Sequence, residues 1–149
     1  MKNYSFLISI FLIMAVTLLT AQEMPPKHRA INPRLTAEGK VLDQSGKQLG
    51  YIKDGKVCDV SGKVLGVIAK TGEVSYGSKG ILGAIQKDGS FKTSKGDVVT
   101  TDVDGVVMAA GKEVARVEAG YKEKSHGCVV HCFFSSNSST AKEIDSHVH

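Results

Sequence analysis

Tryptophan is absent from this 149-residue chain, aromatic residues make up 6% of it, and cysteine and proline occur three times each. Nucleic-acid surfaces usually combine a basic patch with stacking aromatic side chains. Here lysines and acidic residues alternate along the chain, so we expect no nucleic-acid partner. The odd cysteine count (Cys58, Cys128 and Cys132) leaves at least one thiol unpaired within the chain, so the fold is not a disulfide-stapled scaffold.

The first 21 residues carry the pattern of a secretory signal peptide. Lys2 supplies a positive start, residues 6–19 are almost wholly apolar, and the small residue Ala21 ends the segment. A transmembrane helix needs about 20 apolar residues, so we expect cleavage after Ala21, with an uncleaved N-terminal anchor as the alternative. The sequence therefore predicts a periplasmic or extracellular protein with no stable membrane span after cleavage.

The segment from residue 39 to 118 repeats one pattern five times. Opening glycines are spaced by 16, 17, 17 and 16 residues, and an apolar residue follows two positions after each of them. A second apolar position lies near the middle of each unit, and a third lies three residues later in all units except the fourth. The opening glycines are Gly39, Gly55, Gly72, Gly89 and Gly105, and the residues two positions later are Val41, Val57, Val74, Phe91 and Val107.

A period of about 16 residues fits one β-hairpin per unit. The pairs Asp54-Gly55, Asp88-Gly89 and Asp104-Gly105 favour two-residue turns in which both central residues have positive φ. Ser45-Gly46 and Ser61-Gly62 predict further turns about eight residues later. No sustained helical periodicity competes in this region, so the sequence predicts a meander of short antiparallel strands.

The spacing of Leu49 and Ile52 requires an irregular strand. Side chains alternate along a strand with period two, so residues three apart cannot both face one core. Gly50, Gly66 or Gly83 lies between the equivalent residues in the first three units. A β-bulge there would turn both side chains inward; the alternative is that the glycine only allows a neighbouring backbone to approach closely.

Five tandem units of the form G-x-V-x-D-x-S-G-K-x-L-G-x-I resemble the exported five-fold β-flower proteins of bacteria. That resemblance implies one hairpin per repeat around a pseudo-five-fold axis, and it supplies no catalytic residues, since the family has no established activity. We therefore predict an all-β, closed barrel-like fold of five hairpins with a C-terminal apolar strand. The predicted divisions are a signal peptide at 1–21, an exposed lead-in at 22–38, the repeats at 39–118, a linker and closing strand at 119–134, and a disordered tail at 135–149.

The sharpest local cluster of chemically capable residues is H-G-C-V-V-H-C, which contains His126, Cys128, His131 and Cys132. These are ligand types that zinc or copper prefers. On a strand, however, the two cysteines would lie about 13 Å apart, too far for one ion. We favour two packed apolar cysteines with solvent-facing histidines; a metal site and thiol redox chemistry are the alternatives.

The remaining polar residues are explained by local structure. Asp43, Asp59 and the junction aspartates fit turn chemistry better than calcium ligation, because each turn offers one carboxylate. Tyr51 and Tyr76 fit cross-strand packing, with outward-facing recognition residues as the alternative. The sequence thus predicts no enzyme and no cofactor, but a binding or structural module of the cell envelope, with an envelope protein or glycan as its expected partner. A small metal- or thiol-handling protein is the competing interpretation.

Overall fold

The computed structural model describes residues 29–77, 80–136 and 138. Within them lie eleven strands and one helix, and no helix is long and apolar enough to cross a membrane. The elements are β1 (Arg34–Leu35), β2 (Lys40–Leu42), β3 (Gln48–Lys53), β4 (Lys56–Asp59), β5 (Val64–Ile68), β6 (Glu73–Tyr76), β7 (Gly80–Ile85), β8 (Phe91–Thr93), β9 (Val98–Thr101), β10 (Val106–Ala109), β11 (Lys112–Val117) and α1 (His126–Phe134).

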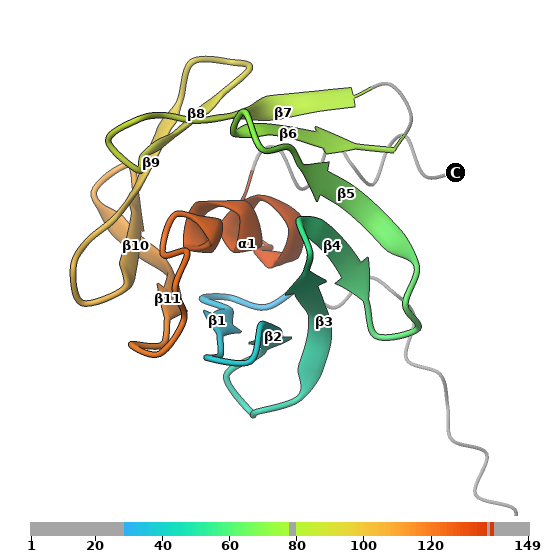
Figure 1. The fold of residues 1–149 in the computed structure, drawn as a ribbon. Helices are drawn as coiled ribbons and strands as arrows, with labels where there is room; N and C mark the ends of the chain where they lie inside the picture. The colour runs from blue at the N-terminus through green and yellow to red at the C-terminus, as the bar shows by residue number, and fades with distance from the viewer. Residues whose placement is uncertain (1–28, 78–79, 137, 139–149) are drawn as a thin grey trace, which may run out of the picture.

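The strands form one closed barrel around α1 (Figure 1). From β2 to β11 each strand pairs antiparallel with the next one along the chain, as the short turns between them require. Strand β1 closes the barrel, because it pairs antiparallel with β2 and parallel with β11. Closure leaves no long open edge for another chain to extend. The predicted all-β, barrel-like fold is confirmed.

Each predicted unit contributes two consecutive strands, and the inward position predicted for each first strand is confirmed. Val41, Val57, Val74, Phe91 and Val107 are all 0% exposed. The first three of them stand opposite Gly50, Gly66 and Gly83 in equivalent registers. A pseudo-five-fold symmetry of the units stays a prediction.

The bulges predicted for the first three units are present, and a further bulge occurs in the fifth unit. The register shifts by one residue opposite the first strand of units one, two, three and five, which leaves Leu49, Leu65, Leu82 or Val114 as the extra residue. The shift lets the bulged residue and the residue three positions later both pack on the core. In the fifth unit Ala115 stands where the others have glycine, so the bulge does not depend on glycine alone.

The three Asp-Gly junctions adopt two turn conformations, and the predicted two-residue turn is present at one of them. Asp54 and Gly55 both have positive φ (51° and 72°), as the predicted two-residue turn needs. The prediction was wrong for Asp88-Gly89 and Asp104-Gly105, where only the glycine takes the left-handed conformation. There the loop is longer: the Gly89 amide donates to the Gln86 carbonyl oxygen, and the Gln86 amide donates to that of Ser90.

Asp43 and Asp59 serve turns, as predicted. Asp43 Oδ1 accepts hydrogen bonds from the Ser45 amide, the Ser45 hydroxyl and the Lys47 amide at 2.7–2.9 Å. Asp59 Oδ1 accepts the equivalent three bonds from Ser61 and Lys63 at 2.6–3.0 Å. These hydrogen bonds lower the pKa of the Asp43 carboxyl group, since they stabilise its charged form. Partial burial acts to raise the pKa of Asp59, but its hydrogen bonds together outweigh this effect and the pKa is lowered.

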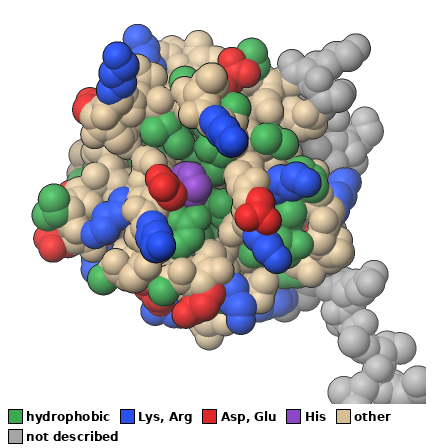
Figure 2. Space-filling model, in the orientation of Figure 1, with side chains coloured by type: hydrophobic (Ala, Val, Ile, Leu, Met, Phe, Trp, Pro, Cys, Tyr) green, Lys and Arg blue, Asp and Glu red, His purple; other side chains and the backbone are tan. Residues whose placement is uncertain are grey.

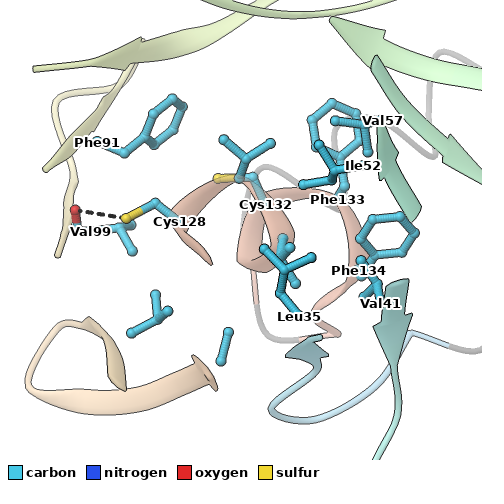
Figure 3. Packing of buried hydrophobic residues seen from close by; sticks show 14 of the residues in the cluster. Leu35, Val41, Ile52, Val57, Phe91, Val99, Cys128, Cys132, Phe133 and Phe134 are labelled. Atoms are coloured by element: carbon cyan, nitrogen blue, oxygen red, sulfur yellow. Dashed lines mark hydrogen bonds between the residues drawn. The ribbon is translucent and has the colours of Figure 1, made fainter. Parts of the chain in front are cut away.

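The predicted closing strand within 128–134 is wrong, because these residues belong to α1. A strand would have had to pair with the barrel wall, whereas the helix satisfies its own backbone and fills the interior with side chains on every face. Figure 3 shows Phe133 beside Ile52 and Val57, and Phe134 beside Val41. Two bulge glycines make room for these rings: a Cβ on Gly50 would lie 2.7 Å from the Phe134 ring, and one on Gly66 would overlap the Phe133 ring.

The predicted boundaries of the flanks also need correction. The lead-in was expected to be exposed, yet Leu35 is 0% exposed and belongs to β1, while Ile31 is 54% exposed. The disordered tail was expected from residue 135, yet Ser135 is buried and pairs with Ala30. The predicted signal peptide and residues 139–149 of the predicted tail lie outside the described residues.

Candidate functional site

The four candidate ligands lie on α1, inside the barrel or at its mouth. Cys128 and Cys132 are one helical turn apart and almost fully buried, so the packed-cysteine prediction is confirmed for both. The prediction of solvent-facing histidines is wrong, since His131 is 6% exposed and His126 is half-buried. The separation of about 13 Å expected between the two cysteines applies to a strand, whereas one turn of α1 rises about 5.4 Å.

The Cys128 thiol is bound into the wall of the barrel. Its Sγ lies 3.3 Å from Thr101 Oγ1, and it donates to the Val99 carbonyl oxygen at 3.4 Å (Figure 3). Burial raises the pKa of the Cys128 thiol, and the hydrogen bond with Thr101 offsets this only in part. A reactive cysteine needs a stabilised thiolate and access to solvent, and Cys128 has neither. No disulfide joins the three cysteines.

His126 and Tyr121 form a pair at the start of the helix. The Tyr121 hydroxyl lies 2.8 Å from His126 Nδ1, and the two rings are tilted at 5.7 Å between centroids. Burial lowers the pKa of His126, which Glu123 partly counteracts, and burial raises the pKa of Tyr121. Both groups are therefore held neutral near pH 7, and their contact anchors the chain that leads into α1.

His131 is the buried polar group of the helix whose hydrogen bonding is incomplete. Among the described residues its Nδ1 has no hydrogen-bond partner, and burial lowers the pKa of the imidazole to about 4. The strands packed against α1 turn apolar side chains inward, among them Leu35, Val99 and Val117. An imidazole in this environment stays neutral near pH 7, because burial among apolar side chains disfavours its charged form.

Within the described part of the chain, no three His, Cys, Asp or Glu side chains gather as a metal-binding group. Because the clustered residues lie on a helix, their side chains point in different directions. Cys128 faces β9, and His126 faces Tyr121. Tyr51 lies opposite Cys58 in the β3–β4 pair, and their hydrogen bond is the main reason that the pKa of Tyr51 is raised. Tyr76 packs partly on the core, as the prediction of cross-strand packing expects. Tyr51 is half-buried beside its cross-strand partner Cys58.

The outer wall carries a feature that the sequence reasoning missed. Seven large apolar side chains are exposed among the described residues, and four of them lie on the outside of β4–β7 and the turn between β4 and β5. We call these four the apolar wall patch. They are Val60 (63% exposed), Val64 (46%), Val67 (42%) and Ile81 (54%).

Lysines border the apolar wall patch along one cross-strand row. The registers place Lys53 opposite Lys56, Lys56 opposite Val67, Val67 opposite Ser75, and Ser75 opposite Ile81. Lys63 directly precedes Val64 at the other end of β5. Like charges directly opposite each other destabilise a sheet, and within the described residues neither Lys53 nor Lys56 forms an ion pair.

A signal for this patch was present in the sequence. Val64-Leu65 and Ile81-Leu82 are apolar doublets, and neighbours on a strand point to opposite faces. Since Leu65 and Leu82 were assigned to the core, Val64 and Ile81 had to face outward.

The end of the barrel seen in Figure 1 is chemically different. Figure 2 shows basic and acidic side chains interspersed around this end, with one histidine near its centre among hydrophobic side chains. Mixed signs at short range do not create a strong field of one sign. The wall is therefore the better candidate for a contact surface.

Comparison with known proteins gives no match: no family model, no curated protein and no solved structure is significantly similar to this chain.

Proposed function

We propose that this chain is an exported, non-enzymatic binding module of the cell envelope, and that the apolar wall patch is its contact surface. The observation that carries the proposal is the clustering of exposed Val60, Val64, Val67 and Ile81 on one side of the barrel. Exposed apolar side chains are usual when scattered singly, whereas a cluster rimmed by polar residues marks an interaction site.

The interior supports a scaffold role. Eight of the nine residues of α1 are buried, and they fill the barrel that a ligand would otherwise enter. The titratable groups on the helix are used for packing and anchoring. The resemblance to five-fold β-flower proteins, and an export route through residues 1–21, belong to this proposal as expectations.

Site-specific photo-crosslinking in intact cells tests the proposal. A photoreactive residue in place of Val67 should give adducts with envelope components, whether protein, glycan or lipid. The same residue in place of Val103, which is 85% exposed in the turn before β10, is the matched control. Equal or absent adducts at the two positions would contradict the proposal.

Metal analysis of untagged protein addresses the competing interpretation. One tightly bound ion per chain that is lost in the Cys128→Ser/Cys132→Ser variant would favour a metal-handling protein over a binding module.

A further inference from the structure

We infer that the apolar wall patch rests on the surface of an anionic lipid bilayer, with Lys53, Lys56 and Lys63 at the headgroups. This inference rests on the proposed function and names the chemistry of the partner.

The shape of the wall favours an extended partner. The patch lies on the outside of a closed barrel, a convex surface across β4–β7 (Figure 1). Small-molecule sites are concave and enclose most of their ligand. A convex wall with protruding side chains fits a partner that deforms around it, as a bilayer interface does.

The side chains distinguish a lipid from a protein partner. Protein interfaces are enriched in tryptophan, tyrosine and arginine and depleted in lysine. The apolar wall patch is made of valine and isoleucine, and its border carries Lys53, Lys56 and Lys63 together with Asp59 and the half-buried Tyr51. Tryptophan and arginine are absent from these residues. Lysine can lay its aliphatic stem along apolar surface while its ammonium group stays in the polar layer, which suits the bilayer interface.

The charges near the patch favour a negatively charged surface. Lys53 and Lys56 are both exposed and face each other across the turn made by Asp54 and Gly55. The nearby Asp59 carboxylate accepts three hydrogen bonds within its own turn. Glu73 lies opposite Ala84, on a different cross-strand row from the two lysines. The exposed Asp54 carboxylate in the turn between Lys53 and Lys56 offsets part of their repulsion, and anionic headgroups would relieve the remainder.

Vesicle flotation of the mature chain tests the inference. Vesicles that contain phosphatidylglycerol should carry the protein to the lipid layer, and vesicles of phosphatidylcholine alone should carry much less. Val67→Ser with Ile81→Ser should lower the partition coefficient by about tenfold, because the exposed branched side chains supply the apolar contact. Val103→Ser, equally apolar and more exposed, should leave binding unchanged.

A second pair of variants tests the charged border. Each lysine near an anionic surface contributes roughly fivefold to binding, so Lys53→Gln with Lys56→Gln should lower the partition coefficient by over tenfold on anionic vesicles. Lys112→Gln with Lys122→Gln removes two exposed charges outside β4–β7 and is the charge-matched control. Circular dichroism of each variant shows whether it is folded.

Three results would overturn the inference: no flotation with anionic vesicles, equal flotation with both vesicle types, or the same loss in the control variants. Failure here together with a protein or glycan adduct at position 67 would overturn the lipid inference and leave the proposed function standing. Failure of both experiments would overturn both proposals.

Discussion

The inner and outer faces of the β4–β5 hairpin carry the same kinds of residue for different reasons. On the inner face Val57 is 0% exposed and stands opposite Gly66, beneath the Phe133 ring. On the outer face Val64 and Val67 are roughly half exposed, and neither is needed to fill the barrel. The inner valine is explained by folding, and the outer valines are not. Apolar residues that the core does not use are therefore the part of this chain that points to a partner.

The largest expected effect is a difference in the free energy of unfolding between one substitution on the inner face of the β4–β5 hairpin and one on its outer face. Val57→Ser should lower the free energy of unfolding by about 3–4 kcal/mol, since it leaves a cavity and buries a hydroxyl group. Val67→Ser should change it by less than about 1 kcal/mol, because that side chain already meets solvent. Chemical denaturation measures both values. Similar losses in the two variants would remove the distinction between the faces.

Acid should lower the free energy of unfolding because of the buried His131. The pKa of His131 is about 4 in the folded protein against 6.5 for an ordinary histidine. Above pH 6.5 the imidazole is neutral in both the folded and unfolded states, so stability is unaffected. As the pH falls from 6.5 to 4 only the unfolded chain takes up the proton, and the loss approaches about 3 kcal/mol.

Denaturation at several pH values, compared between the wild-type chain and His131→Leu, measures this effect. The variant should lose most of the slope between pH 6.5 and 4. An unchanged slope would show that other groups cause it, among them His126, whose pKa is also lowered by burial.

A smaller effect should follow from filling the space under the helix. A Cβ on Gly66 would overlap the Phe133 ring and the Ser75 carbonyl oxygen, so Gly66→Ala should cost about 2 kcal/mol. Adding Phe133→Leu should recover part of that loss. Phe134→Leu is the control, because the Phe134 ring lies over Gly50 instead. A double-mutant cycle measures the coupling, and equal coupling for both phenylalanines would contradict the assignment of rings to glycines.

The barrel was predictable from the sequence because each repeat places apolar residues at the inward-facing strand positions and glycine at the turns. Val41 and its four equivalents, the bulge beside Leu49 and the Asp54-Gly55 turn all follow from local spacing and backbone preference. The aspartate turns at Asp43 and Asp59 were predictable for the same reason.

The helix was not predictable, and the physical cause is its burial. A helix surrounded on all sides loses the alternation of apolar and polar residues that identifies a surface helix. The run from Cys128 to Phe134 is apolar throughout except His131, so its sequence fits a short strand equally well. Strand β1 was missed because two residues after Pro33 are too few to show any pattern. Both errors concern segments whose structure is set by the barrel and not by their own sequence.

The central helix has a consequence for the order of folding. The residues that occupy the middle of the barrel come after all eleven strands in the chain, and they contact walls made by residues nearly one hundred positions earlier. A nascent chain that stops before residue 126 has hairpins but nothing for them to close around. We therefore expect the barrel to stay open until α1 has been synthesised, which is the condition in which the preceding strands can still be threaded through a narrow channel.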